Sequence, residues 1–557
     1  MTLRTLLRAL EGLLSGLVAL ALASCSAAGG PSSYTLRPAS GPTVELWGAV
    51  PPPPAGSEPE ATASTEGPAA VASAPGPLEL RVLDAVLLAF QNNRELAVER
   101  LNPPIRQTFE LQELAVFDPV LAASLAWQRE VLEQFPSGGG GLRSVTTRSA
   151  AGTIGLSEFL PTGTSVSVDV SGNESSSSSS GTTLGQTRVG LSVTQSLLRG
   201  AGVDVNLASV RQARLTTLAS EYELRGFAEA LMANVEDAYW DYALALRQID
   251  IVTDSLALAE RQLADTQERI AVGQLAEIEL AAAQSEVALR KEGLINARSA
   301  LATAKLILLR LVNAGPAGPG GSLWERDITL LEEPIVPEAA LDSVEAEVAL
   351  GLRMRPDLNQ ARLDLERNEL ELVKTRNGLL PRMDLFIALG KSGYAASFGD
   401  SVGRLGGPGH DVLAGVNLEY PPLNRGARAR NEQARLTRQQ SGEAVANLAQ
   451  LVELDVRSAY IEVNRAREQV TATAATRKYQ QETLRAETEK FQVGKSTTFL
   501  VARAQRDLVA SQIAEVQAVV NYRKALVDLH RQEGSLLARQ GIEAPGGAPP
   551  VLPAARK

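Results

Sequence analysis

Few residues of this 557-residue chain are of types that catalyse reactions or bind metals. It has two histidines, His410 and His530, and one cysteine, Cys25. His410 lies in a glycine-rich stretch and His530 near the end of a long helical pattern, so we interpret both as surface or packing residues. We find no serine–histidine–acid grouping, no cluster of metal ligands and no phosphate-binding loop. The sequence therefore predicts neither an enzyme nor a cofactor, and leaves the thiol of Cys25 as the main candidate for covalent chemistry.

Cys25 ends a segment with the character of a secretory signal. Arg4 and Arg8 precede an apolar run over residues 13–22, which Ala23 and Ser24 follow. A basic start, a short apolar core and small residues are typical of a signal peptide. The sequence Leu-Ala-Ser-Cys at residues 22–25 resembles the lipobox of bacterial lipoproteins. This resemblance implies a lipoprotein signal peptide over residues 1–24 and acylation of Cys25; an ordinary signal peptide with a chance cysteine is the alternative.

Three segments have compositions that cannot bury enough apolar area to order themselves. Residues 25–78 are rich in Pro, Ala, Gly and Ser, and we predict a disordered tether there. Residues 314–337 form a predicted linker and residues 541–557 a disordered tail. Ser26, next to the cysteine, resembles the residue found in lipoproteins sorted to the outer membrane. That resemblance implies a chain anchored to outer-membrane lipid at Cys25, with its helices in the periplasm.

Bulk composition argues against some partners. Hydrophobic residues make up 44% of the chain and aromatic residues 4%, and the formal net charge is −10 without a basic block. We therefore expect no nucleic-acid partner. Because aromatic side chains normally dominate thick cores, their scarcity favours thin seams between helices.

The rest of the chain is an internal duplication. A set of residues between 235 and 284 recurs after 221 positions without a gap. These are Val235, Ala238, Tyr239, Ala245, Gln248, Val272, Gly273, Ala283 and Gln284, which match Val456, Ala459, Tyr460, Ala466, Gln469, Val493, Gly494, Ala504 and Gln505. The openings of the two copies match at an offset of 262 positions, as Pro119 does with Pro381. We predict a first structural repeat over residues 79–313 and a second over 338–540.

Each copy contains two segments in which apolar and polar residues alternate, as in strands. They cover residues 166–170 and 189–193 in the first copy, and residues 383–389 and 412–418 in the second. Such strands suit either a soluble sheet or a membrane barrel. The first copy holds about 41 extra residues, the difference between the two offsets, around residues 137–187. They are rich in Gly and Ser, so we interpret them as loop; whether residues 150–170 cross the membrane stays open.

Each copy also carries two long proline-free helical patterns, which are too charged to span a membrane. They cover residues 207–270 and 274–312, then 427–493 and 495–533, and a shorter helix is predicted over residues 78–101. Leu280, Val287, Leu294, Leu301 and Leu308 recur by sevens, with Arg290 as the one charged misfit in the seam. A seven-residue repeat predicts a left-handed coiled coil. A glycine breaks each pair, and permits the positive φ that a helix–helix turn can require.

These features together resemble the TolC-like outer-membrane efflux family, in its lipoprotein-type members. The resemblance covers nearly all of residues 79–540. The stretches at residues 195–200 and 421–426 look like the family's strand-to-helix exits, and those at 271–275 and 492–496 like its periplasmic turns. It implies an α+β membrane protein in which long antiparallel coiled-coil hairpins form a periplasmic α-barrel. It also implies a homotrimer, with four strands per chain in a shared 12-stranded β-barrel.

The same resemblance assigns roles to the two hairpin tips. They would contact a periplasmic adaptor (membrane fusion) protein through Val272, Gly273, Gln274, Leu275, Val493, Gly494, Lys495 and Ser496. Family members often carry an acidic residue six positions after the turn glycine, where three chains build a constriction. Glu279 holds that position in the first copy, with Glu277 nearby, but the second copy has Leu500 there and Arg503 further on. We predict a mixed aperture from these four; solvated outer-face charges at Glu277 and Arg503 are the alternative.

The sequence thus predicts the outer-membrane duct of a tripartite efflux system, a passive exit for substrates driven by an inner-membrane pump through the adaptor. An outer-membrane duct for type I protein secretion would need the same structure. The alternative of a different class is a periplasmic coiled-coil structural or adaptor lipoprotein without a pore.

Overall fold

A computed structural model describes residues 77–135, 141–179, 181–312, 324, 326–336 and 341–542 of the chain. All of these belong to one of two units, the one that spans Leu46–Lys557. The predicted signal peptide, Cys25, nearly all of the predicted tether and the tail beyond residue 542 lie outside the described residues. Leu78, the last residue of the predicted tether, begins a strand.

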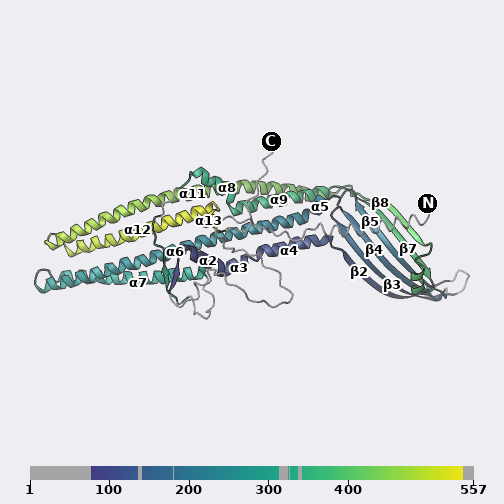
Figure 1. The fold of residues 1–557 in the computed structure, drawn as a ribbon, viewed down its shortest axis with the longest axis horizontal. Helices are drawn as coiled ribbons and strands as arrows, with labels where there is room; N and C mark the ends of the chain where they lie inside the picture. The colour runs from purple at the N-terminus through teal and green to yellow at the C-terminus, as the bar shows by residue number, and fades with distance from the viewer. Residues whose placement is uncertain are drawn as a thin grey trace, which may run out of the picture. The chain divides into compact units, whose positions relative to one another are not determined.

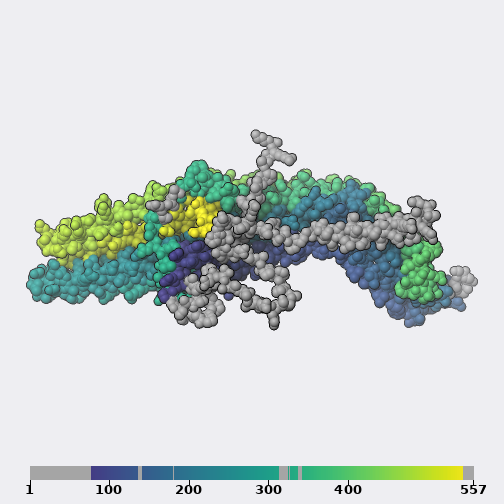
Figure 2. All heavy atoms as spheres, viewed as in Figure 1, coloured from purple at the N-terminus to yellow at the C-terminus, as the bar shows by residue number. Residues whose placement is uncertain are grey.

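Two long helical hairpins dominate the described residues. Helix α6 (Ala208–Ala271) turns back into α7 (Ile278–Val312), and α11 (Arg425–Gln492) turns back into α12 (Thr498–Gln532). The four predicted long helices are confirmed, although α7 and α12 each begin a few residues later than predicted because the turns extend past their glycines. The two hairpins lie side by side, with α12 packed on α6 (Figures 1 and 2).

The duplication is visible in matching hydrogen bonds. Tyr239 on α6 donates its hydroxyl to Leu80 O at 3.1 Å, and Tyr460 on α11 donates to Asp342 O at 3.2 Å. The two tyrosines are 221 positions apart and the two acceptors 262 apart, the same two offsets that relate the copies in sequence. Each bond holds the opening segment of a repeat against its long helix.

Short elements fill the space around the long helices. Strand β1 (Leu78–Leu80) pairs in parallel with β6 (Ile328–Leu330), which lies inside the predicted linker. The predicted helix over residues 78–101 is wrong as one element: after β1, it divides at Asn93, whose extended backbone and side chain cap the next helix at Leu96 N. The helices are α2 (Val82–Asn92), α3 (Arg94–Glu99), α4 (Asn102–Leu114), η2 (Ala115–Phe117), α5 (Val203–Asn206), α8 (Val344–Met354), α9 (Pro356–Asn377), α10 (Phe398–Gly403) and α13 (Leu536–Arg539).

The largest buried cluster lies where α6 meets α2, β1, β6 and α12. The scarce aromatic residues gather here: Tyr239 and Trp240 are buried and pack edge to face with ring centroids 5.1 Å apart. The guanidinium of Arg523 on α12 covers the Trp240 ring at 4.3 Å. A smaller cluster joins α11 to α8, α9 and α12.

The long strands form one antiparallel six-stranded sheet in the order β2-β3-β4-β5-β7-β8 (Figure 1). Its strands are β2 (Val120–Gln134), β3 (Arg143–Leu160), β4 (Thr164–Ser177), β5 (Thr183–Ser196), β7 (Arg382–Ala395) and β8 (His410–Glu419). The prediction of four strands per chain is therefore corrected to six. The extra residues of the first copy are not a loop: β3, β4 and the Ser175–Ser177 run pair within the sheet.

The register places most of the apolar positions of the six strands on one face. One row across the sheet consists of Leu121, Leu156, Val168, Leu191, Leu389 and Val412. The opposite face carries Ser, Thr, Gly and Asp in the neighbouring rows. Apolar side chains on the first face are largely exposed in the single chain, for example Leu121 at 71% and Val412 at 68%. An apolar face of this extent needs a lipid or protein partner.

Helix α10 covers glycine-rich positions on the same apolar face. Gly172, Gly185 and Gly393 lie under its backbone and under the Phe398 ring, where any Cβ would overlap them. Thr187 and Ser401 share a buried hydrogen bond of 2.6 Å beneath the helix. The glycines therefore make the recess in which α10 sits.

Within the part of the chain that the structure describes, none of the helices is both long enough and apolar enough to cross a membrane.

The matched tyrosines predict unequal effects of the same substitution. Tyr239 is fully buried and its hydroxyl also accepts a hydrogen bond from Glu332 N, whereas Tyr460 is half-buried. We expect Tyr239→Phe to lower the free energy of unfolding by about 1–3 kcal/mol, because its buried partners lose their hydrogen bonds. Tyr460→Phe should lower it by less than about 1 kcal/mol, because water can replace the hydroxyl of the half-buried Tyr460. Denaturant unfolding of the purified protein followed by circular dichroism measures both; equal losses would contradict the assignment.

Candidate functional site: the hairpin tips and the seam between hairpins

The two tips share one backbone geometry. Gly273 and Gly494 have φ of 77° and 75°, values that favour glycine. At the first tip, Gln274 N donates to Arg269 O at 2.8 Å and Gly273 N to Ile270 O at 2.9 Å. Lys495 and Gly494 make the same two bonds at the second tip. This is the Schellman arrangement, which satisfies the last carbonyls of a helix and reverses the chain.

The tips differ in what stabilises the return helix. At the second tip, the Thr497 side chain caps α12 at Leu500 N, but Ala276 holds the matching position at the first tip. Glu487 also accepts hydrogen bonds from Lys490 at 2.6 Å and Ser496 at 2.8 Å, which hold its pKa below the ordinary value. The second tip is therefore the better fastened of the two.

The predicted tip residues are accessible on the single chain. Leu275 and Ser496 are half-buried, and the other six are exposed. Val272 and Val493 are 64% and 67% exposed, which is high for apolar side chains and leaves an apolar contact point at each tip. Contact with an adaptor stays a prediction.

Of the predicted aperture residues, Glu277, Leu500 and Arg503 are exposed and Glu279 is half-buried, and they are not brought together within one chain. Glu277 and Glu279 lie at the start of α7, and Leu500 and Arg503 near the start of α12. Arg503 Nε lies 4.0 Å from Asp507 Oδ2 on its own helix. Among the described residues, no hydrogen bond or ion pair joins Glu279 to Leu500 or Arg503. A shared aperture therefore requires further chains, and both placements of Glu277 and Arg503 stay open.

Sequence reasoning missed the contacts that join the hairpins just behind the tips. Gln505 on α12 donates to Gln262 on α6 at 2.8 Å, and Arg506 lies 3.7 Å from Glu286 on α7. Glu286 also pairs with Arg290 at 2.6 Å. Two signals pointed here: Gln505 belongs to the repeated set, and Arg290 is the charged misfit of the heptad pattern.

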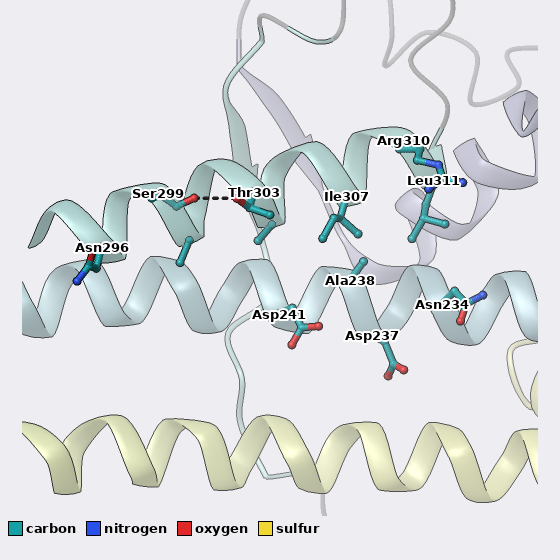
Figure 3. A pocket seen from close by; sticks show the side chains of 12 residues that line it. Asn234, Asp237, Ala238, Asp241, Asn296, Ser299, Thr303, Ile307, Arg310 and Leu311 are labelled. Atoms are coloured by element: carbon teal, nitrogen blue, oxygen red, sulfur yellow. Dashed lines mark hydrogen bonds between the residues drawn. The ribbon is translucent and has the colours of Figure 1, made fainter. Parts of the chain in front are cut away.

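An open groove of about 790 Å³ runs between α6 and α7 (Figure 3). Its lining is mainly small or amide side chains such as Asn234, Asn296, Ser299 and Thr303, with Ile307 among them. Asp241 at its edge pairs with Lys524 of α12 at 2.6 Å. Within the described residues, no group of His, Cys, Asp or Glu is arranged to hold a metal ion. The groove is open and lined mainly by small side chains, so it suits a packed helix better than a small ligand.

The acids with the most strongly raised pKa lie away from the tips: Glu229 and Glu236 on α6, and Glu533 at the end of α12. Burial raises the pKa of Glu229 to about 7, against the opposing effect of Arg225 at 3.3 Å. Burial raises the pKa of Glu236 to about 7 as well, and its Oε1 has no hydrogen-bond partner among the described residues. Burial in the seam therefore favours the protonated form of both carboxyls.

Replacing the tip glycines tests the turn geometry. Neither glycine has an atom within 4 Å of an added Cβ, so only the backbone conformation opposes a side chain. We expect Gly273→Ala and Gly494→Ala each to cost about 1–2 kcal/mol locally and to speed amide exchange at Gln274 and Lys495. Gly293→Ala, inside α7, is the control: it should stabilise by about 0.5–1 kcal/mol. Unchanged exchange at both tips would contradict the argument.

Glu236 predicts a pH-dependent stability. Because its folded pKa is raised, its favourable contribution is complete below the unfolded value of about 4.3 and is lost as pH rises through about 7. Glu236→Gln removes the ionisation, so its stability relative to the parent should rise by up to about 3 kcal/mol between pH 4.5 and 8. Thermal melting across this range measures the difference. The exposed Glu223 on the same helix is the control, since Glu223→Gln makes the same substitution outside the buried seam.

The comparisons with known proteins agree with this geometry. The family model described as outer membrane efflux protein matches residues 122–314 and 350–535. The chain is similar to the outer membrane efflux protein BepC of Brucella suis biovar 1 (strain 1330), with 26% identity over 334 residues, 59% of this chain and 68% of BepC.

Two solved structures share the fold. A structure of CusC, described as forming a transmembrane channel, matches with a TM-score of 0.60 at 17% identity, over 82% of this chain and 93% of CusC. The open state of the Neisseria gonorrhoeae MtrE outer membrane channel matches with a TM-score of 0.57 at 17% identity, over 82% of this chain and 89% of MtrE. Since the family model covers both repeats and well over half of the chain, the protein belongs to the outer membrane efflux protein family, whose members are outer-membrane channels of tripartite efflux systems.

Proposed function

We propose that three copies of this chain close into a passive exit duct, lipid-anchored at Cys25, which receives small solutes from an inner-membrane pump through a periplasmic adaptor. The hairpins form the periplasmic wall and the sheets form the part in the outer membrane. The observation that carries the trimeric duct is a missing contact. The duplication implies two equivalent contacts between a return helix and a long helix, and a single chain makes only one of them.

Within a chain, α12 of the second repeat packs on α6 of the first. By the duplication, α7 corresponds to α12 and α11 corresponds to α6. The equivalent packing is therefore α7 on α11, and these two helices lie on opposite sides of the hairpin pair, as Figure 1 shows. Only a neighbouring chain can make this contact without unfolding the hairpins. A ring of chains makes it at every interface.

Individual residues carry the same argument. Val516 of α12 packs against the cluster on α6, but its counterpart Ile295 on α7 is 67% exposed. Trp240 of α6 is buried under α12, but its counterpart Ile461 on α11 is 68% exposed. Exposed isoleucines at positions whose copies are buried indicate a face that another chain covers. The groove between α6 and α7, with Ile307 in its lining, continues this face (Figure 3).

A pair of cysteines tests the interface directly. The bond between Gln505 and Gln262 has its equivalent at Gln284 and Thr483, both exposed on the single chain. We expect the double variant Gln284→Cys with Thr483→Cys to cross-link between chains under oxidation and migrate as a trimer on denaturing gels. The matched control, Gln262→Cys with Gln505→Cys, should cross-link within one chain and migrate as a monomer. Monomers from both variants would overturn the trimeric duct.

The sheet supports placement of the duct's other end in the outer membrane. Its apolar rows extend along β2 to Trp127, with Arg129 next on that face beyond the apolar positions. The eight residues of tilted strand from Val120 to Trp127 span about 20 Å of membrane normal, most of the height of about 25 Å of the apolar band of outer-membrane barrels. An aromatic residue at its limit fits the interfacial girdle of such barrels.

We assign the aperture to Glu279, Leu500 and Arg503, with Glu277 beside them, at the periplasmic mouth. Rings of carboxylates favour cations, and an arginine opposes that preference. In planar bilayers, we expect Glu279→Ala to lower cation selectivity and Arg503→Ala to raise it, each with a change in single-channel conductance. Leu289→Ala, behind the tip on α7, is the control that should leave both unchanged. If neither charge variant alters conductance or selectivity, the aperture lies elsewhere.

Outer-membrane fractionation of the full chain, followed by conductance of the purified protein in planar bilayers, tests the duct as a whole. We expect a heat-sensitive oligomer that resists carbonate washing and conducts ions. A monomer released by carbonate and without conductance would favour the structural or adaptor alternative. Cargo is tested separately, because efflux of small solutes and secretion of proteins require the same duct.

A further inference from the structure

We infer that the β-barrel of this protein has 18 strands and a wide, water-filled lumen, because each chain contributes all six strands of its sheet. This inference rests on the proposed trimer. It concerns the hairpin formed by β3 and β4, which lies in the insertion that distinguishes the first repeat from the second. The alternative is a 12-stranded barrel with this hairpin folded outside it.

The hairpin lies inside the sheet and not at its edge. β3 pairs with β2 from Val120↔Ser157 to Gln134↔Arg143, and with β4 from Thr147↔Ser177 to Leu160↔Thr164. β4 in turn pairs along its length with β5. Removing the hairpin from the barrel would break two complete ladders and leave β2 without a partner in its own chain. Each broken ladder exposes a row of unpaired backbone groups.

The hairpin also carries the surface of a membrane strand pair. Ile154, Leu156, Val168 and Val170 continue the apolar rows of the neighbouring strands and are 42–58% exposed on the single chain. An extracellular lid would not require apolar side chains in register with those of β5 and β7. The lipid that covers those strands covers these as well.

The turn of the hairpin is built into the start of the helical wall. Gly163 N donates to Leu160 O, Gly163 O accepts from Ser196 N, and Thr162 O accepts from Gly202 N. Asn206 donates its amide to Pro161 O and to Gly200 O, both at 2.9 Å. Gly163 has a φ of 85° and touches Gly200 so closely that any Cβ would overlap its carbonyl oxygen. The segment that connects β5 to α5 is thus hydrogen-bonded to the turn of the extra hairpin.

The free edges fit closure by copies of the same chain. The sheet ends at β2 and β8, which run in opposite directions because β2 leaves the helical wall and β8 returns to it. β8 of one copy and β2 of the next therefore pair antiparallel, like every other long-strand pair, and closure removes all edges. With strands about 4.8 Å apart and tilted by about 40°, 18 strands give a backbone radius of about 18 Å, compared with about 12 Å for 12 strands.

Two neighbouring rows of the lumen face are lined mainly by side chains too small to fill such a barrel. Neighbouring rows on this face consist of Ala122, Gly155, Asp169, Gly190, Gly390 and Asp411, and of Ser124, Thr153, Ser171, Arg188 and Ser392. Arg188 pairs with Asp411 at 2.9 Å and faces Asp169 at 3.7 Å, so its charge is held against the wall. Side chains occupy about 5 Å, half the spacing of packed sheets, which leaves a free radius of about 13 Å for 18 strands and about 7 Å for 12. The outer exit is thus wide enough not to limit passage.

Electron cryo-microscopy of the purified full chain counts the strands directly. We expect a threefold barrel with 18 strands and β3 and β4 in the wall. A trimer with a 12-stranded barrel, and the hairpin outside it, would overturn this inference and leave the proposed duct intact. Absence of a trimer would overturn the proposed duct, and this inference with it.

A deletion variant tests the width in solution. Removing residues 141–181 leaves residues 135–140 and 182 between β2 and β5. These two strands run antiparallel and both place their odd-numbered residues on the apolar face. The shortened sheet should close as a 12-stranded barrel. Ser192, on the lumen face of β5, is present in both chains. Substituted as Ser192→Cys, it reports which maleimide reagents enter.

We expect a maleimide polymer of about 10 Å radius, added from the outer side, to label Ser192→Cys in the full chain and at least tenfold less in the deletion variant, given the free radii estimated above. A small maleimide should label both chains, which shows that the deletion variant folds and stays open. The parent chain without the substitution controls for Cys25. Equal exclusion of the polymer from both chains would contradict the wide lumen.

Discussion

The structure depends on the packing of a return helix of one repeat on the long helix of the other. The duplication implies two such contacts, and a single chain makes one. α12 rests on α6, with Arg523 over Trp240 and Gln505 bonded to Gln262. The equivalent surfaces of α7 and α11 carry Ile295 and Ile461 in the open. Burying an exposed isoleucine stabilises by about 1.5–3 kcal/mol, and each interface repeats such contacts along two long helices. The proposed closure into a ring meets this requirement and would set the positions of tips, wall and sheet.

Much of the helical part could be predicted because its signal is long and periodic. Heptads, absent prolines and paired glycines identify α6, α7, α11 and α12, and the 221-position offset pairs Tyr239 with Tyr460. The matching bonds of these tyrosines come from the structure alone. The sheet was harder. β2 has apolar residues on both faces, such as Val120 beside Leu121, so its alternation is weak. β3 and β4 are rich in Gly and Ser, which resembles a loop when the partner strands are unknown. Only the ladders reveal them.

The candidate site divides in the same way. The tip glycines are predictable because a positive φ favours glycine, so the residue type itself marks the turn, as at Gly273 and Gly494. The ion pairs around Glu286 and Arg290 could not be predicted, because they depend on which helices meet. Their only sign in the sequence is the charged Arg290 in a heptad position that is otherwise apolar. The proposed aperture is harder still to predict, since its residues would meet only across chains. The tips also show that the copies have diverged: Thr497 and Ser496 fasten one tip, where Ala276 and Leu275 stand in the other.

An insertion between β2 and β5 can widen the sheet without disturbing the helices, because an antiparallel hairpin begins and ends at the same edge. A single added strand would reverse the chain and bring α6 to the wrong end. At that edge each chain presents α4, α6, α9 and α11 side by side. In the proposed trimer these make twelve helices, which at 8–10 Å spacing form a wall of about 15–19 Å radius. A barrel of 12 strands is about 12 Å in radius and must narrow from this wall, whereas one of 18 strands, at about 18 Å, continues it. The added hairpin thus matches the barrel to the wall that carries it, so the duct keeps its width from the helices to the exit.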